Sequence, residues 1–114
     1  MDDCIFCKIG AGSIPAEVVH RDDEILAFRD INPVAPTHIL IIPRKHIPSN
    51  RDIQPQDEPL LGRMFSVARD LAIQEGIDSQ GYRLILNTGD HGGQEVYHLH
   101  LHLIGGRPMQ HPMG

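Results

Sequence analysis

The segment from His98 to Leu103 alternates histidine with leucine without a break. Successive side chains of a β-strand point to opposite faces, so a strand here would place His98, His100 and His102 on one face and the three leucines on the other. The leucines suit a buried core, and the histidines then face a cleft, a metal ion or solvent. An ordinary solvated face draws on Lys, Thr, Glu and Arg, so three alternating histidines favour a functional site.

Two chemistries fit three imidazoles on one strand face. Histidine is the commonest metal ligand near neutral pH, so alternating rings could bind a metal ion. Alternatively, the central imidazole of His100 could attack phosphorus, with its neighbours orienting it and donating hydrogen bonds. Gly92 and Gly93 favour phosphorus chemistry, because backbone N–H groups at a glycine pair can approach an anion closely.

The remaining sequence predicts an α+β fold in a single domain covering residues 1–114. Apolar residues recur at helical spacing from Leu60 to Ala72, with Pro59 in the first turn and Gly76 as the stop, which indicates one main helix. A short N-terminal helix is expected at residues 4–9. Strands are expected at 18–20, 25–28, 38–42, 82–86 and 96–104. Several of them are joined by hairpin-length links, so we expect a five-stranded, mostly antiparallel sheet.

Charge and hydropathy exclude several partner classes. The formal net charge is −5, and no basic stripe of the kind that nucleic-acid binders carry is visible, so no nucleic-acid partner is expected. No apolar run approaches the ~20 residues that span a bilayer, and no membrane partner is expected. The chain begins Met1-Asp2-Asp3 without the basic and apolar regions of a signal peptide, which predicts a cytoplasmic location.

The histidine segment with its following isoleucine, residues 98–104, resembles the signature of the histidine-triad (HIT) superfamily: His, apolar, His, apolar, His, two apolar. The resemblance extends over nearly the whole chain, through segments 4–9, 27–33, 35–38, 43–47, 92–97 and 105–107. The chain is similar to the Hint branch, whose members hydrolyse purine nucleoside phosphoramidates and aminoacyl-adenylates. The resemblance implies a HIT-like fold, a homodimer, and a hydrolase that cleaves at the α-phosphorus through a nucleotidyl-histidine and releases a nucleoside monophosphate.

The resemblance also implies roles at matching positions. His100 matches the nucleophile, and His102 and Asn87 match groups that contact the phosphate. His98 is the first histidine of the triad, and His38 matches a fourth active-site histidine in addition to the triad. Gln94 matches the loop beside the α-phosphate, and Asp30 matches the carboxylate that binds the ribose. The apolar slot for the purine corresponds to Ile5, Phe6, Ile9, Phe28 and Ile31. From the residues alone, Ile5, Phe6 and Ile9 fit a core equally well, and Asp30 fits the start of a turn.

The chain departs from some relatives at two places. Glu95 stands where some animal Hint proteins have a serine that approaches the phosphate and leaving group. A carboxylate repels a phosphate, so we expect Glu95 to point away or to contact a leaving amine. The tail from Pro108 to Gly114 lacks a tryptophan found in some relatives, whose tails can reach the partner's site.

Cys4 and Cys7 have the spacing of half a zinc site. Some HIT relatives and the related galactose-1-phosphate uridylyltransferases bind zinc through such a pair, a mid-chain histidine and the first triad histidine, which implies His46 and His98 as the other two ligands. Four protein ligands predict structural zinc, with no metal required for the chemistry. Alternatively, the cysteines act as small apolar side chains.

Other functions remain open at this point. The chain could hydrolyse dinucleoside polyphosphates, as the Fhit branch does, or it could be a non-catalytic nucleotide-binding zinc protein that works through partners. A binding protein does not require a nucleophile, which argues against the second alternative. A thiol redox protein using Cys4 and Cys7 lacks the expected βαβ context.

Overall fold

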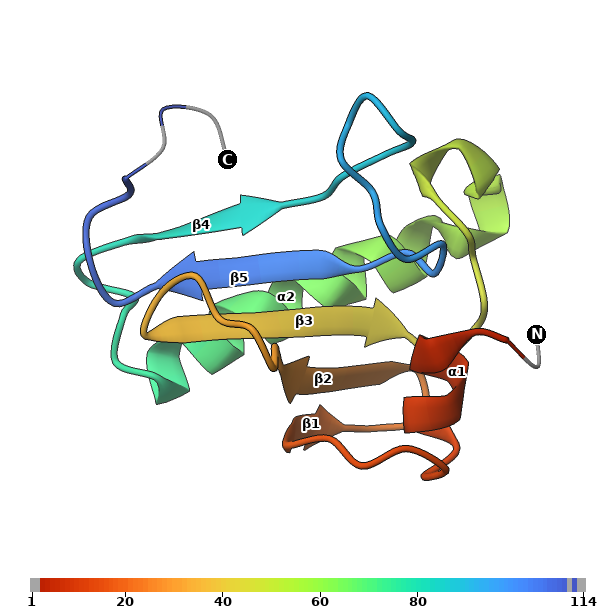
Figure 1. Cartoon of the computed structure of the whole chain (residues 1–114), viewed down its shortest axis with the longest axis horizontal. Coiled ribbons are helices and arrows are strands. Elements are labelled where there is room, and N and C mark those ends of the chain that lie inside the picture. The colour runs from red at the N-terminus through yellow and green to blue at the C-terminus, as the bar shows by residue number, and fades with distance from the viewer. Residues whose placement is uncertain (1–2, 111, 113–114) are drawn as a thin grey trace.

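A computed structural model of the chain describes residues 3–110 and 112. Five strands form one sheet in the order β1-β2-β3-β5-β4, and every neighbouring pair is antiparallel (Figure 1). The strands are β1 (Val18–Arg21), β2 (Ile25–Arg29), β3 (Thr37–Pro43), β4 (Tyr82–Ile85) and β5 (Leu101–Gly105). The α+β class and the antiparallel sheet are confirmed.

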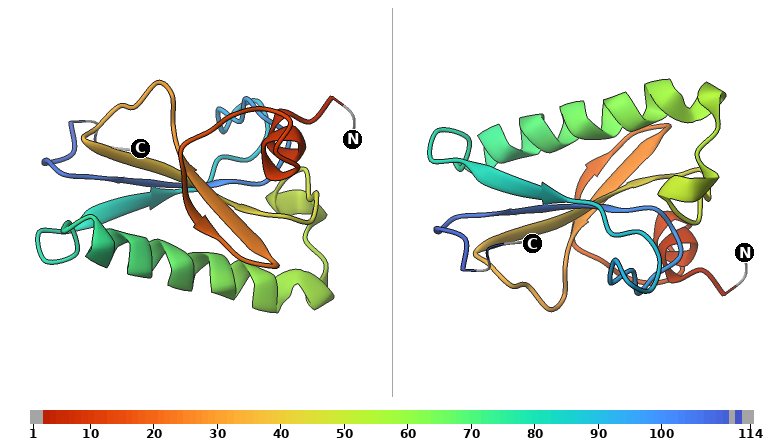
Figure 2. Two further views of the ribbon diagram at one scale, coloured as in Figure 1. Left: turned by 90° about the horizontal axis from the view of Figure 1, so that it is seen from below. Right: turned by 90° about the horizontal axis from the view of Figure 1, so that it is seen from above.

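Two α-helices lie on opposite sides of this sheet (Figure 2). The main helix α2 (Glu58–Gln74) runs along one face, and the short α1 (Ile5–Gly10) lies against the other. Two 3₁₀ turns, η1 (Asn50–Asp52) and η2 (Pro55–Asp57), lead into α2. Neither α-helix in the described part of the chain is long and apolar enough to cross a membrane.

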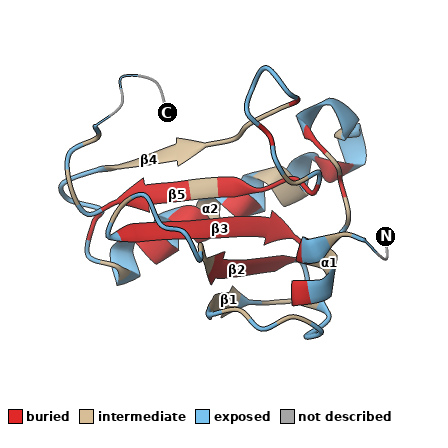
Figure 3. Ribbon diagram, viewed as in Figure 1, coloured by how far each residue is buried: buried red, intermediate tan, exposed pale blue. Residues whose placement is uncertain are grey.

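The period of two along the strands divides the apolar residues into two cores. Odd-numbered positions of β2, β3 and β5, such as Ile39 and Leu101, pack with the buried face of α2. Even-numbered positions such as Leu40 pack with Phe6 and Ile9 of α1 on the other face. Both faces of β3 are therefore covered, and every residue of β3 is buried (Figure 3).

β5 is shorter than the histidine alternation predicts. The strand expected at 96–104 is wrong in its first half, because the ladder to β3 begins at the pair Ile41–Leu101 and the ladder to β4 at Ile85–His102. No strand in the described chain pairs with residues 96–100, and the Leu99 N–H instead donates to the Ile47 carbonyl at 2.7 Å. The side-chain alternation still holds, since Leu99, Leu101 and Leu103 all enter the α2 core.

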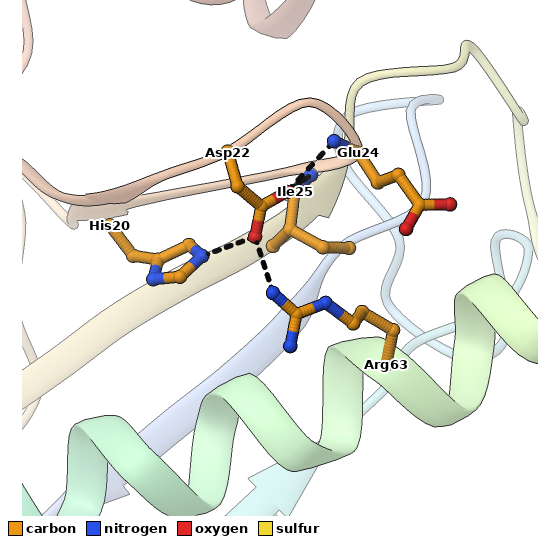
Figure 4. Close-up of polar contacts among 5 residues, drawn as sticks. All are labelled: His20, Asp22, Glu24, Ile25 and Arg63. Atoms are coloured by element: carbon orange, nitrogen blue, oxygen red, sulfur yellow. Dashed lines mark hydrogen bonds and ion pairs between the residues drawn. The ribbon is translucent and has the colours of Figure 1, made fainter.

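Asp22 fastens the β1–β2 turn to α2 (Figure 4). One of its carboxylate oxygens accepts the N–H groups of Glu24 and Ile25, and the other lies 2.6 Å from His20 Nε2 and 2.8 Å from Arg63 Nη2. Burial alone would raise the pKa of Asp22, but the bonds from His20 and the two N–H groups outweigh it and hold this pKa well below its usual value. The ionised carboxylate thus fixes one edge of the sheet against the helix.

Candidate active site

A cavity of about 480 Å³ opens on the sheet face that carries α1. Its walls are α1, the segment after β2 and the loop before β5, three parts of the chain that Figure 1 shows around the same face. Three of the predicted histidines, His38, His100 and His102, line it. His98 does not line the cavity, because its ring is fully buried beside the cysteines.

One backbone carbonyl sets the tautomer of His100. Nδ1 of His100 lies 2.7 Å from the carbonyl oxygen of His98, which can only accept, so Nδ1 carries the proton. The lone pair therefore resides on Nε2, and the ring of Phe6 meets the imidazole edge to face at 5.1 Å. Burial lowers the pKa of His100, although the bond to His98 and the charges of Asp30 and Glu95 oppose this. His100 is thus a neutral imidazole near neutral pH.

His38 and His102 form a second pair with fixed protons. The Val34 N–H donates to Nδ1 of His38 at 3.2 Å, so the proton of His38 resides on Nε2 and is donated to Nδ1 of His102 at 3.0 Å. His102 consequently keeps its proton on Nε2, which makes no hydrogen bond within the described residues. Burial, followed by the neighbouring His100 and His38, lowers the pKa of His102 to about 4. His102 is a neutral N–H donor whose ring centre lies 5.0 Å from that of His100.

The same tautomers decide against a metal ion at this pair. Donor atoms of Asp30, His38 and His102 lie within 4.8 Å of one another, which is close enough for three ligands. However, Nε2 of His38 carries a proton as long as Nδ1 accepts from Val34, and a protonated nitrogen cannot ligate a metal. His38 and His102 therefore form a hydrogen-bonded pair, and Asp30 Oδ2 lies 3.5 Å from Nε2 of His38.

The loop before β5 supplies a second polar wall. Asn87 and Gly93 line the cavity, and Asn87 Nδ2 donates to the Gly92 carbonyl at 2.7 Å. Gly93 has a φ of 79°, in the left-handed region that glycine tolerates best. A side chain at Gly92 would collide with the backbone of Thr88. The glycine pair is therefore needed for the loop's own conformation.

Gln94 supports this loop from behind. Its side chain is buried, with Nε2 donating to the carbonyls of Pro48 and Val96 at 2.8 and 3.0 Å and Oε1 accepting the Gly89 N–H at 3.0 Å. Gln94 is not among the cavity's lining residues. The side chain expected to contact substrate instead holds in place the loop that lines the cavity.

The apolar residues expected to hold the purine all line the cavity. They are Ile5, Phe6, Ile9, Phe28 and Ile31. Phe6 and Phe28 meet edge to face at 5.4 Å, while Ile31 is 88% exposed. An apolar side chain this exposed beside a cavity suits a ligand-binding rim. Asp30, next to Ile31, accepts the Asn32 N–H through Oδ1 at 2.8 Å, so it also forms the predicted turn.

Cys4, Cys7, His46 and His98 form a separate cluster whose donor atoms lie within 4.8 Å of one another. Nδ1 of His98 is 3.3 Å from Cys4 Sγ and 3.5 Å from Cys7 Sγ, and Nδ1 of His46 is 3.4 Å from Cys7 Sγ. Tetrahedral zinc with Zn–S of about 2.3 Å and Zn–N of about 2.0 Å requires S···N separations of about 3.5 Å. This donor set is therefore compatible with a metal ion.

The groups behind the cluster also suit a metal. Nε2 of His98 lies 2.7 Å from the Pro43 carbonyl oxygen and donates to it, which leaves Nδ1 unprotonated toward the sulfurs. Burial, together with Cys4, raises the pKa of the Cys7 thiol to about 11. A thiol with this pKa is a poor nucleophile without a metal, which argues against the redox alternative.

Known proteins share both the sequence and the fold of this chain. The family model for "Scavenger mRNA decapping enzyme C-term binding" matches residues 3–113. Purine nucleoside phosphoramidase of Escherichia coli (strain K12) is 56% identical over 108 residues, which cover 95% of this chain and 91% of that protein. Protein HitA of Neisseria gonorrhoeae is 48% identical over 105 residues, which cover 92% of this chain and 97% of that protein.

Solved structures agree with these sequence matches. A HIT family hydrolase from Legionella pneumophila Philadelphia 1 superposes with a TM-score of 0.95 at 55% identity, covering 98% of this chain and all of that one. A histidine triad protein from Clostridium difficile superposes with a TM-score of 0.94 at 45% identity, covering 97% of this chain and 96% of the other. The fold, the histidine constellation and these relatives together show that the chain belongs to the histidine-triad (HIT) family.

Proposed function

We propose that this protein hydrolyses purine nucleoside phosphoramidates and aminoacyl-adenylates at the α-phosphorus, with His100 as the nucleophile. The observation that carries the proposal is the tautomer of His100, whose Nδ1–H is held by the His98 carbonyl and whose Nε2 lone pair remains for attack. The activity named for the Escherichia coli relative, with its 56% identity, supports the same reaction class.

The lining of the cavity suggests how such a substrate binds. The purine lies in the apolar slot between α1 and Phe28, and the Asp30 carboxylate accepts hydrogen bonds from the ribose hydroxyls. Within the loop, the N–H groups of Gly92, Gly93 and Gln94 already donate to the carbonyls of Gly89 and Asp90. The α-phosphate therefore meets the Nε2–H of His102 and the amide of Asn87. These groups are preorganised dipoles, which stabilise developing charge on phosphorus without a cation.

The reaction proceeds in two displacements. Nε2 of His100 attacks the phosphorus and the P–N bond breaks. The nitrogen, protonated by solvent beforehand, leaves as a neutral amine, while the Nε2–H of neutral His102 donates a hydrogen bond to the phosphate. The resulting imidazolium is stabilised by the hydrogen bond from Nδ1 to the His98 carbonyl. Water then attacks the phosphorus, loses a proton to solvent and releases the nucleoside monophosphate with free, neutral His100.

A two-substrate assay tests the reaction class. We expect the enzyme to release AMP from adenosine phosphoramidate far faster than from a diadenosine polyphosphate. His100→Ala should lower the rate by more than about 10³-fold, because it removes the nucleophile. His91→Ala is the matched control, since His91 is exposed and does not line the cavity. Preferred cleavage of the polyphosphate would support the second candidate function instead.

Structural zinc bound by Cys4, Cys7, His46 and His98 is the second part of this proposal. The S···N separations and the Pro43 bond behind His98 support it. Such an ion would link α1 to the segments before η1 and β5 without taking part in phosphorus chemistry, since four protein ligands leave no open position. The two cysteines are free thiols, which suits the reducing cytoplasm as the expected location.

A homodimer is the third part of the proposal, with each chain forming one domain over residues 1–114. On α2, Phe65 is 50% and Ile73 54% exposed. The edge strand β4 is only half buried, and a hollow of about 810 Å³ beside it is lined by Tyr82, Leu84 and Arg107 among others. Exposed apolar side chains on a helix, together with an open strand edge, suit a self-complementary two-fold interface.

A further inference from the structure

The cavity's charged lining consists of three side chains, and two of them are already paired. Arg29 Nε lies 2.9 Å from Glu17, and its two terminal nitrogens lie 2.8 and 2.9 Å from the Glu75 carboxylate. Asp30 accepts the Asn32 N–H and approaches His38. Among the described residues that line the cavity, no cation is therefore left to meet a substrate's negative charge.

Glu95 is the third charged side chain. It is exposed and makes no hydrogen bond or ion pair within the described part of the chain. Its charge reaches His100, where it favours the protonated imidazole. An uncompensated carboxylate thus stands beside the nucleophile in a protein whose net charge is already −5.

The geometry of displacement relates Glu95 to the leaving group. The leaving group departs from phosphorus on the side opposite Nε2 of His100. The nucleoside is placed along α1 and residues 28–31, so the remaining route from the phosphorus runs along the loop wall of Asn87, Gly93 and Glu95. The carboxylate therefore borders the path of the departing amine rather than the purine slot.

We infer that Glu95 selects substrates whose leaving group carries a positive charge, such as the ammonium of an aminoacyl-adenylate or of a diamine phosphoramidate. This inference rests on the proposed function. The same carboxylate disfavours acidic leaving groups and the additional phosphates of a dinucleoside polyphosphate. Because Glu95 is exposed to solvent, the preference is modest, about two- to fivefold in kcat/KM for one charge. It weakens as salt screens the charges.

Three adenosine phosphoramidates of matched length test this inference. Their amine chains end in an ammonium, a methyl or a carboxylate group, and kcat/KM is measured for each. Wild type should prefer them in that order, Glu95→Gln should bring the three values close together, and Glu95→Lys should reverse the order. About 1 M salt should flatten the wild-type order, because the Debye length falls to about 3 Å.

Glu24→Gln is the matched control because it removes the same charge outside the cavity. Figure 4 shows the Glu24 carboxylate making none of the contacts drawn there, and this variant should keep the wild-type order. Equal values for all three substrates in wild type, or an unchanged order in Glu95→Gln, would overturn the inference while leaving the proposed function intact. No turnover of any of the three would overturn the proposed function, and the inference with it.

Discussion

Backbone groups assign the protons of the site histidines. The His98 carbonyl holds the proton of His100 on Nδ1, and the Val34 N–H leaves the proton of His38 on Nε2. His38 donates this proton to Nδ1 of His102 in a 3.0 Å hydrogen bond, which leaves the proton of His102 on Nε2. Backbone positions are set by the fold, so His100 and His102 hold the tautomers that the proposed reaction needs before substrate binds.

The protonation of His100 predicts the acidic limb of the pH profile. Attack requires the neutral ring, and burial lowers the pKa of His100 below its ordinary 6.5. The neutral form therefore persists to lower pH than for an exposed histidine. We expect kcat/KM to stay level down to about pH 6.5 and to fall only below it. The measurement is kcat/KM between pH 4 and 8, with a substrate that does not itself titrate in this range.

A variant checks the assignment of that limb to His100. The charge of Asp30 favours the protonated ring, so Asp30→Asn should move the limb to lower pH. Asp78→Asn serves as the control, because Asp78 is exposed and lies outside the cavity. If kcat/KM of the wild-type enzyme already falls at pH 7 or above on the acidic side, His100 is not held neutral as described.

At the scale of elements, the sequence predicted which face of the sheet each side chain lies on. It predicted less well which residues pair through the hydrogen bonds of the sheet. The histidine–leucine alternation correctly separated the leucines that enter the α2 core from the histidines. It did not show that the β5 ladder begins only at Leu101, since this depends on where the neighbouring strands β3 and β4 end. Side-chain periodicity is a property of one segment, whereas pairing is a property of two.

Gln94 shows a second limit of prediction from the sequence. Its partner Pro48 lies 46 residues away, and no local pattern indicates that the two segments meet. The sequence predicted that Gln94 belongs to this loop, but a long-range contact sets the direction of the Gln94 side chain. The apolar slot was more accessible to prediction, because Phe6 and Ile9 share a face of a short helix that the sequence already indicated.

The proposed zinc predicts how firmly α1 is held. This helix has only six residues, and its N-terminus is capped by Cys4, whose Sγ accepts the Cys7 N–H at 3.3 Å. Protein purified without chelator should contain about one zinc per chain. His46→Ala should lose the metal and lower the melting temperature, since ligand binding to the folded state stabilises it.

Elemental analysis and thermal unfolding measure these two effects. His91→Ala should match wild type in both, because His91 lies outside the cluster. Wild-type protein that contains no zinc, or His46→Ala protein that binds it fully, would contradict the four-ligand site. The first result would favour the alternative in which the cysteines act as small apolar side chains.

For the whole molecule, the exposed apolar side chains of Phe65 and Ile73 on α2 predict assembly. Light scattering at micromolar concentration should give twice the mass of the chain. Phe65→Arg should shift the protein toward the monomer, because it places a charge in the proposed interface. Gln74→Arg is the control, adding the same charge at an exposed polar position of α2. A wild-type monomer under these conditions would refute the dimer.

The whole account depends on a covalent intermediate at His100, and the stereochemistry at phosphorus tests it most directly. One diastereomer of an adenosine phosphorothioamidate is hydrolysed in ¹⁸O-labelled water, and the configuration of the labelled AMP thiophosphate is determined. Each in-line displacement inverts phosphorus, so attack by His100 followed by attack by water predicts net retention. Net inversion would show that water attacks the substrate directly and that His100 is not the nucleophile.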